Sequence, residues 1–159
     1  MEEKLVNLLI KYNLKITTVE SCTGGMIASR IVNISGASGV FSEGYITYSE
    51  EAKMKMVGVK RETIEKYNVV SENVAYEMAL GGAMTANADV ALSVTGVAGP
   101  SGGTKDIPVG TVCIGLFFNN RVITQKHCFS GDRLEVREKA AEKAIEIAIN
   151  EIKKSMSVK

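Results

Sequence analysis

Hydrophobic residues recur at two different spacings along the chain, and the alternation between them predicts helices separated by strands. Helical spacing, with apolar residues three or four positions apart, occurs in the segments 1–13, 26–34, 50–57, 62–67, 72–86 and 132–153. Short runs rich in β-branched and aromatic residues fall between these segments, at 15–20, 40–48, 88–94, 109–118 and 121–129. We therefore expect an α/β protein.

Two of the predicted strands constrain the sheet. The run 88–94 is almost continuously apolar, which is typical of a strand covered on both faces, so it should be central. Asn119 and Asn120 separate the last two strands, which predicts an antiparallel hairpin. Alternating elements with one hairpin favour a mixed sheet with helices on both faces, and they leave the strand order open.

Composition places the chain in a broad class. It has 159 residues, 45% of them hydrophobic, which suits one domain spanning residues 1–159. Nineteen basic residues balance 18 acidic ones, so we expect neither nucleic acid nor a membrane as partner. The three cysteines, an odd number, favour reduced thiols. Neither a signal peptide nor an apolar stretch of roughly 20 residues is present, so we expect a soluble, cytoplasmic chain.

The first candidate site is the turn between the first predicted strand and the helix that follows, from Glu20 to Gly25. A helix N-terminus offers unpaired N–H groups and the positive end of its dipole, which stabilise a thiolate, an oxyanion or a phosphate. The paired glycines allow a ligand to approach the backbone closely. The alternative is that Ser21 or Thr23 only caps the helix.

A second candidate pair, Tyr48 and Lys53, brackets the junction between a strand and a helix. A desolvated, neutral lysine can take a proton from a serine hydroxyl. By themselves, these two residues are more typical of an edge tyrosine and a solvated lysine. The spacing is one residue longer than the Tyr-x-x-x-Lys pair of short-chain dehydrogenases, and no dinucleotide fingerprint precedes it, which argues against hydride transfer.

A third candidate is the loop 95–103, which follows the most apolar strand. Four of the eight residues from Gly96 to Gly103 are glycines, so the backbone of this loop can face a ligand. It is not a P-loop, because no Gly-Lys-Ser or Gly-Lys-Thr ends it. The alternative is a long structural turn.

Cationic and metal-binding side chains give weaker signals. Arg133 and Arg137 lie one helical turn apart and can grip a phosphate or a carboxylate, although surface ion pairing is the more common outcome. His127 is the only histidine, and its place in a strand pattern favours a structural role. The three cysteines lack metal-ligand spacing, so we expect no metal.

Five motifs, in their order along the chain, together resemble the CinA C-terminal domain family. They are the turn from Glu20 to Gly25, Tyr48 with Lys53, the loop from Thr95 to Gly103, Pro-Val-Gly-Thr-Val at 108–112 and Gly-Asp-Arg at 131–133. The resemblance extends from about Leu5 to Ile149 and is to the standalone form, without the nucleotide-processing domain of longer members. It implies a three-layer α/β/α fold with a mixed sheet, and a homodimer.

The resemblance also implies an activity: hydrolysis of the carboxamide of nicotinamide mononucleotide to nicotinic acid mononucleotide and ammonia, with no cofactor. It places the catalytic residues at Ser21, Tyr48 and Lys53. In this hypothesis Ser21 attacks the amide carbon, a neutral Lys53 with a lowered pKa accepts its proton, and Tyr48 relays or orients. Backbone N–H groups of the first turn stabilise the oxyanion. Candidate substrate-binding residues are Cys22, Thr23, Gly24, Gly25, Thr95, Gly96, Gly99, Arg133 and Arg137.

Two other functions fit the same residues. A regulatory module can keep the nucleotide pocket and turn nothing over, and the same scaffold can act on another small amide or on a phospho-sugar. Ammonia release from nicotinamide mononucleotide separates these alternatives.

Overall fold

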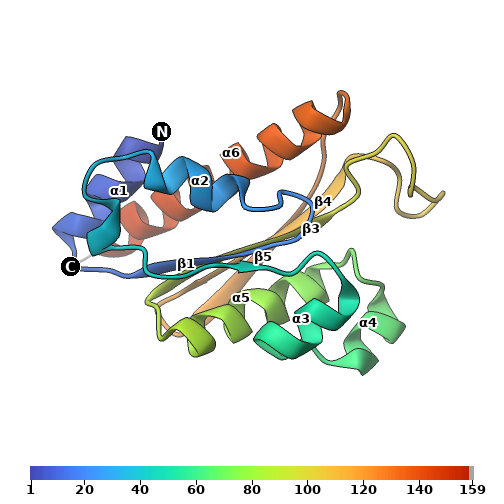
Figure 1. Ribbon diagram of the computed structural model, residues 1–159, viewed down its shortest axis with the longest axis horizontal. Coiled ribbons are helices and arrows are strands. Elements are labelled where there is room, and N and C mark those ends of the chain that lie inside the picture. Colours follow the sequence, from blue (N-terminus) through green and yellow to red (C-terminus); the bar gives the residue numbers. More distant parts are fainter. Residues whose placement is uncertain (158–159) are drawn as a thin grey trace.

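A five-stranded mixed sheet separates two layers of helices in the computed structural model, which describes residues 1–157 (Figure 1). The spatial order is β2-β1-β3-β4-β5, with β1 parallel to both of its neighbours and the last two pairings antiparallel. The strands are β1 (Ile16–Glu20), β2 (Tyr45–Ile46), β3 (Val90–Gly96), β4 (Thr111–Phe118) and β5 (Arg121–Cys128). The predicted central strand and the predicted hairpin are both confirmed.

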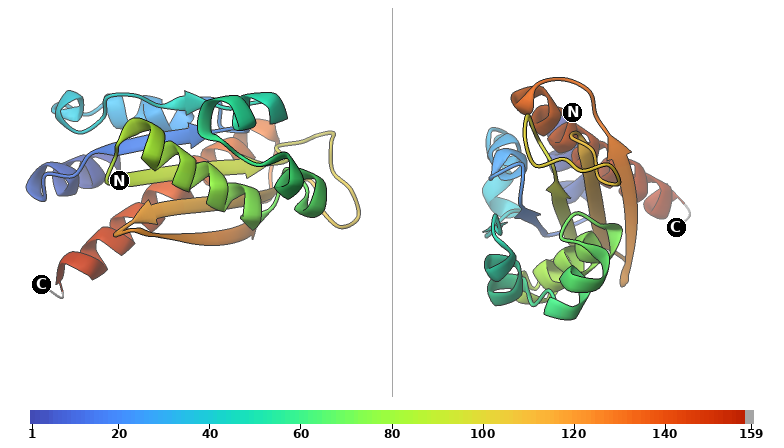
Figure 2. Two further views of the ribbon diagram at one scale, coloured as in Figure 1. Left: turned by 90° about the horizontal axis from the view of Figure 1, so that it is seen from below. Right: turned by 90° about the vertical axis from the view of Figure 1, so that its right-hand side faces the viewer.

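Helices cover both faces of the sheet (Figure 2). One face carries α1 (Glu2–Lys11), α2 (Met26–Val32) and α6 (Arg133–Ser157), and the other carries α3 (Glu50–Val57), α4 (Arg61–Tyr67) and α5 (Glu72–Ala86). The predicted three-layer α/β/α arrangement is therefore confirmed. None of the helices within residues 1–157 has the length and apolarity needed to cross a membrane.

The sheet places alternate side chains in separate hydrophobic clusters on its two sides, because successive residues of a strand point to opposite faces. In β3, Leu92 and Val94 pack in the larger core with α1, α2 and α6, whereas Ala91 packs against α5 on the other face. Both faces of β3 and β4 are buried, as the apolar run 88–94 predicted for the first of them.

The segment 40–48 differs from the single strand that its alternation predicted. Only Tyr45–Ile46 forms a strand, and the chain before it contains a 3₁₀ turn (Ala37–Gly39) and one isolated bridge between Phe41 and Ile16. Val40 is buried and Phe41 half-buried in the larger core, although neither belongs to a strand. The alternation here reflects the burial of side chains and not a continuous hydrogen-bonded ladder.

The carboxyl ends of β1 and β3 lie side by side, and the chain leaves them in different directions. From β1 it enters α2 on one face, from β2 it enters α3 on the other, and from β3 it forms the long loop 97–110 that projects beyond the sheet (Figure 1). Ligands in open α/β sheets bind outside the strand ends at such a divergence. The fold therefore positions a site at this edge.

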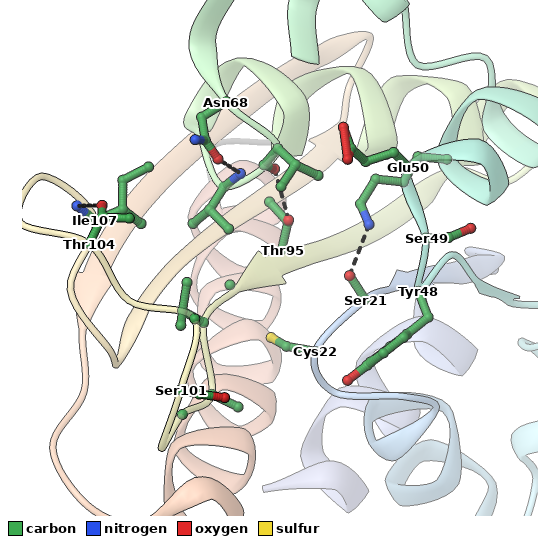
Figure 3. Close-up of a pocket in the computed structure, with 18 of the residues that line it drawn as sticks. Ser21, Cys22, Tyr48, Ser49, Glu50, Asn68, Thr95, Ser101, Thr104 and Ile107 are labelled. Atoms are coloured by element: carbon green, nitrogen blue, oxygen red, sulfur yellow. Dashed lines mark hydrogen bonds between the residues drawn. The ribbon is translucent and has the colours of Figure 1, made fainter. Parts of the chain in front are cut away.

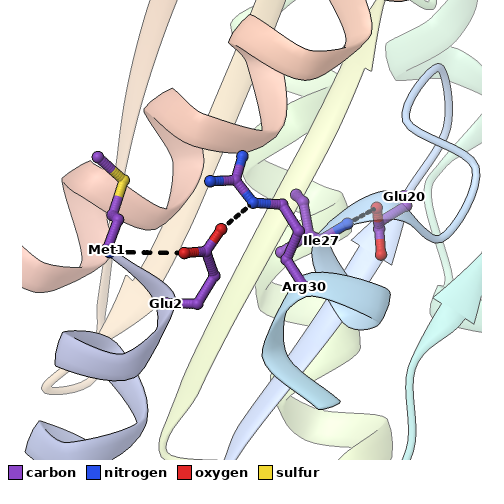
Figure 4. A network of polar contacts seen from close by, with 5 residues as sticks. All are labelled: Met1, Glu2, Glu20, Ile27 and Arg30. Atoms are coloured by element: carbon purple, nitrogen blue, oxygen red, sulfur yellow. Dashed lines mark hydrogen bonds and ion pairs between the residues drawn. The ribbon is translucent and has the colours of Figure 1, made fainter. Parts of the chain in front are cut away.

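Glu20 fixes the start of α2 from inside the protein (Figure 4). Its carboxylate is 1% exposed and accepts hydrogen bonds from the backbone N–H groups of Ile27 at 2.8 Å and Ala28 at 3.0 Å. The residue before the helix, Gly25, has a φ of 101° and makes no side-chain cap. Glu20 therefore takes the place of a cap, since an anion at a helix N-terminus satisfies N–H groups and the helix dipole together.

Replacing Glu20 by glutamine is expected to lower the free energy of unfolding by about 2 kcal/mol, because one charged acceptor of two buried N–H groups is lost. Urea denaturation measures the change. Glu142→Gln, at an exposed position on α6, is the matched control and should change stability by less than about 0.5 kcal/mol. Equal effects of the two substitutions would contradict a capping role.

Candidate active site

A cavity of about 510 Å³ opens at the carboxyl ends of β1 and β3 (Figure 3). Four parts of the chain line it: the turn after β1, the junction between β2 and α3, the segment before α5 and the loop after β3. Arg133, at the start of α6, closes the wall. All three predicted catalytic residues, Ser21, Tyr48 and Lys53, line this cavity.

Ser21 and Lys53 meet inside the cavity although 32 positions separate them in sequence. The Nζ of Lys53 lies 2.9 Å from the Oγ of Ser21 and donates a second hydrogen bond, of 2.7 Å, to the carbonyl of Thr47. The alternation of β1 explains the meeting: Glu20 points into the α2 layer, so the next side chain, Ser21, points toward α3. The dashed line between Ser21 and the lysine amine in Figure 3 marks this contact.

Lys53 is buried, in contrast to an ordinary helix lysine. Its side chain is 1% exposed, because it lies with Val57 on the face of α3 that is turned toward the protein. Burial lowers the pKa of Lys53 to about 8, with Cys22 and Glu50 opposing that shift. About a tenth of the amine is therefore uncharged at pH 7, and about half at pH 8, and this form is able to accept a proton.

Cys22, next to the serine, is held as a thiol. Burial raises the pKa of its sulfhydryl to about 11, although Lys53 and Arg137 lower it in part. Because the thiolate is the nucleophilic form of cysteine, Cys22 is unreactive at neutral pH. Ser21, in contrast, has its hydroxyl within hydrogen-bond distance of the amine of Lys53, which can act as its base. The structure therefore favours serine as the nucleophile.

Tyr48 lies at the mouth of the cavity and pairs with Arg133. Its side chain is 61% exposed, and its hydroxyl accepts a hydrogen bond of 3.0 Å from the guanidinium of Arg133. The same guanidinium donates to the carbonyl of Gly99 at 2.8 Å. Arg133 thus connects the β2–α3 junction with the loop after β3, and Tyr48 bonds to this arginine and not to Ser21 or Lys53 among the described residues.

The glycine-rich loop forms the wall opposite Tyr48, where Thr95, Gly96 and Gly99 all line the cavity. The hydroxyl of Thr95 donates to the carbonyl of Val69 at 2.9 Å, which joins β3 to the segment before α5. A Cβ at Gly96 would lie 2.8 Å from the carbonyl oxygen of Thr111, so only glycine fits there. Gly99 has a φ of 83°, a conformation that favours glycine.

The sequence model of the CinA C-terminal domain matches residues 1–152 of this chain. The chain belongs to this family. The CinA-like protein of Kosmotoga olearia is 53% identical over 141 residues, which cover 89% of this CinA domain and 34% of that protein. The domain spans about a third of the length of the curated relatives that it matches.

Solved structures of the family have the same fold as this CinA domain. A CinA superfamily protein from Klebsiella pneumoniae is 32% identical with a TM-score of 0.92, and the match covers 95% of this chain and 94% of that one. The competence/damage inducible protein CihA from Agrobacterium tumefaciens is 36% identical with a TM-score of 0.87, covering 94% and 95%. The fold of this CinA domain therefore extends across distant members of its family.

Four predicted substrate contacts lie outside the cavity lining of this CinA domain: Thr23, Gly24, Gly25 and Arg137. The guanidinium of Arg137 donates to the carbonyls of Cys22 at 2.9 Å and Thr23 at 3.1 Å, so it braces the turn that carries Ser21. Gly24 packs against that guanidinium, and Gly25 packs against Ile46. Helical spacing predicted a shared role for Arg133 and Arg137, but one turn of α6 places Arg133 at the cavity and Arg137 behind the turn that carries Ser21.

The N-terminus of α2 is also occupied, because Glu20 already accepts from Ile27 and Ala28. The N–H groups that remain for an oxyanion are those of the turn itself. Within residues 1–157, the N–H groups of Cys22 and Thr23 donate to no protein acceptor, whereas that of Gly24 donates to the carbonyl of Ser21.

Several polar residues of the cavity carry no signal in the sequence, Asn68 and Glu50 among them. Asn68 lines the wall before α5, and its side-chain oxygen accepts from the N–H of Val70 at 3.1 Å. Glu50 lies inside the Tyr48 to Lys53 motif and lines the cavity, but it looked like an ordinary acidic residue of a first helical turn. Among residues 1–157, no group of three or more His, Cys, Asp or Glu side chains is arranged to hold a metal ion.

Proposed function

We propose that this CinA domain hydrolyses the carboxamide of nicotinamide mononucleotide to nicotinic acid mononucleotide and ammonia. The observation that carries the proposal is the 2.9 Å contact between the buried amine of Lys53 and the hydroxyl of Ser21 in the cavity. A serine next to a lysine of lowered pKa is a nucleophile with its own base. Membership of the CinA family supports the choice of substrate.

In the proposed mechanism, the neutral amine of Lys53 takes the proton of Ser21 while its oxygen attacks the amide carbon. The C–N bond then breaks, and the Lys53 ammonium returns the proton to the departing nitrogen, which leaves as ammonia. A water molecule attacks the resulting ester, with Lys53 again accepting a proton, and releases the carboxylic acid and free Ser21. One water is consumed for each amide.

Charge that develops on the amide oxygen needs donors close to Ser21. Two N–H groups of the turn, those of Cys22 and Thr23, donate to no residue of the described chain. That of Cys22 is suited to this role because Cys22 lines the cavity, whereas Thr23 is buried outside it. Arg137 holds the carbonyls of the same two residues, which fixes the turn. We assign Tyr48 the task of orienting Arg133, to which its hydroxyl is bonded.

A coupled assay of ammonia release tests the proposal. Nicotinamide mononucleotide, its riboside, free nicotinamide and an unrelated small amide are compared at equal concentration. The proposed enzyme releases ammonia fastest from the mononucleotide. Faster turnover of another amide would assign a different amidase, and binding of the mononucleotide without ammonia release from any amide would assign a regulatory module.

Arg133 is expected to bind the 5′-phosphate of the substrate, because its guanidinium lines the cavity and retains N–H groups beyond the two that bond to Gly99 and Tyr48. Loss of a charge-assisted contact costs about 1.5 to 3 kcal/mol, so Arg133→Ala should raise the KM for the mononucleotide by roughly 10- to 100-fold. Steady-state kinetics measures the KM of Arg133→Ala and of the parent.

The riboside, which lacks the phosphate, is the internal control for this substitution. Arg133→Ala should change its KM by less than about threefold. Arg121→Ala is the matched variant, since Arg121 is an exposed arginine on β5 that pairs with Glu151. Equal weakening of nucleotide and riboside by Arg133→Ala would show that Arg133 orients the site and does not recognise phosphate.

A further inference from the structure

Two carboxylates line the cavity, those of Glu50 and Glu51 in the first turn of α3. Neither forms an ion pair or a side-chain hydrogen bond with any residue in the range 1–157. Glu50 is exposed to solvent and, like Lys53, borders the cavity from α3. Figure 3 shows Glu50 on the same wall of the cavity as the amine that reaches Ser21.

An anion at this position works against the catalytic base. Glu50 favours the protonated form of Lys53, whereas the reaction requires the neutral amine. Acidic residues in a first helical turn stabilise the helix dipole, and both Glu50 and Glu51 stand in that turn of α3. Glu50 also lines the cavity, where a carboxylate without a partner among residues 1–157 can bind a cation.

We propose that Glu50 is the counter-charge that selects a substrate whose ring carries a permanent positive charge, a pyridinium amide. The inference rests on the proposed function and makes it more specific. Arg133 at the mouth supplies the cation for a phosphate, and Glu50 supplies the anion for the ring. The cavity then matches a ligand with a negative group at one end and a positive group at the other.

Binding of such a ring also removes the disadvantage of Glu50 for catalysis. The pyridinium charge offsets the carboxylate, so the neighbouring amine of Lys53 loses its proton more readily in the complex than in the free protein. The other titratable or charged groups that line the same cavity are Cys22, Tyr48, Glu51 and Arg133. A cationic substrate thereby favours the protonation state that its own hydrolysis needs.

The test compares two ligands of nearly the same shape, nicotinamide mononucleotide and its reduced 1,4-dihydropyridine form, whose ring is neutral. Calorimetry on the full chain carrying Ser21→Ala gives the Kd of each without turnover. Glu50→Gln in that background is expected to weaken the cationic ligand by roughly 3- to 10-fold, the size of a partly exposed ion pair. Its effect on the reduced ligand should stay below twofold.

Two further variants separate recognition from helix stability. Glu62→Gln removes an exposed glutamate from the first turn of α4, outside the cavity, and should leave both Kd values unchanged. Glu51→Gln tests the neighbouring carboxylate. The proposal is overturned if Glu50→Gln weakens both ligands equally, or if Glu51→Gln and not Glu50→Gln removes the preference for the cation.

The pH profile of turnover provides a second readout. With the carboxylate of Glu50 removed, the pKa of Lys53 falls, so kcat/KM for Glu50→Gln should reach its plateau at lower pH than for the parent. An unchanged midpoint would contradict the placement of Glu50 beside Lys53. If no amide releases ammonia, the proposed function fails, while the preference in Kd still reports on Glu50 by itself.

Discussion

Replacing Ser21 by alanine is expected to lower kcat for ammonia release by at least about a thousandfold, because the reaction loses the atom that forms the covalent intermediate. The side chain is 7% exposed and its Oγ lies 2.9 Å from the amine of Lys53, so the change removes one hydroxyl and leaves the cavity otherwise intact. Binding of nicotinamide mononucleotide should persist. Steady-state kinetics measures kcat, and calorimetry measures the binding of nicotinamide mononucleotide.

Cys22→Ala is the matched control for Ser21→Ala, since it removes the neighbouring nucleophilic atom from the same turn. The pKa of about 11 keeps this thiol protonated at neutral pH, so its loss should reduce kcat by less than about tenfold. Thermal denaturation establishes that both variants fold. If Cys22→Ala abolished turnover while Ser21→Ala preserved it, serine would not be the nucleophile.

Short stretches of the sequence were sufficient to predict most of the helices and strands of the fold. The apolar run 88–94 predicted a strand buried on both faces, and Asn119 with Asn120 predicted the hairpin between β4 and β5. Ser71 is of a residue type favoured at helix N-caps, and its side chain accepts from the N–H of Val74. These features depend on a few neighbouring residues, which is why they can be inferred without the tertiary structure.

The burial of Lys53 could not be predicted from its neighbours. A lysine in the first turns of a short helix is ordinarily solvated. Here α3 packs against the protein with Lys53 and Val57 on its buried face, so Lys53 is only 1% exposed and its amine lies beside Ser21. The resemblance to the CinA family, and not the spacing from Tyr48, assigned Lys53 to the site. Tyr48 itself is exposed, as an edge tyrosine is expected to be.

The separate tasks of the two arginines also depend on tertiary structure. Arg133 and Arg137 share a helix face, but α6 passes the mouth of the cavity at one and the back of the β1–α2 turn at the other. In the same way, Glu20 belongs to the motif that predicted an anion site at α2, yet its own carboxylate occupies that helix end. Sequence spacing identified β1, α2 and α6 correctly, and the side-chain directions came only from the structure.

Lys53→Arg is expected to remove nearly all turnover, because a guanidinium stays protonated and cannot accept the proton of Ser21. In the parent protein kcat/KM should rise about tenfold per pH unit below the pKa of about 8 and level off above it, as the neutral amine becomes the dominant form. Kinetics between pH 6 and about pH 9.5 measures both effects. Substantial turnover by Lys53→Arg would exclude lysine as the base.

Lys53→Met should abolish activity because it removes the base, and the variant should still fold. The pH dependence of its free energy of unfolding, compared with that of the parent, tests whether the amine of Lys53 has a lowered pKa. The pKa of Lys53 is about 8 in the folded protein and 10.5 for an exposed lysine, so between these values the unfolded chain binds more protons than the folded one. The contribution of Lys53 to the free energy of unfolding of the parent therefore rises with pH across that window, by about 3 kcal/mol. Below pH 8 both states bind the proton, and the penalty of burial is then complete and constant.

Methionine does not titrate, so the stability of Lys53→Met relative to the parent should be greatest below pH 8 and should fall by that amount toward pH 10.5. Urea denaturation of both proteins at matched pH values measures the difference, in which the titration of groups that do not interact with Lys53 cancels. Lys55→Met, at an exposed position on the same helix, controls for the loss of a lysine, because an exposed amine keeps its hydration in the folded chain. A difference for Lys53→Met that did not change with pH would mean that the amine beside Ser21 is not held in a form ready to accept a proton.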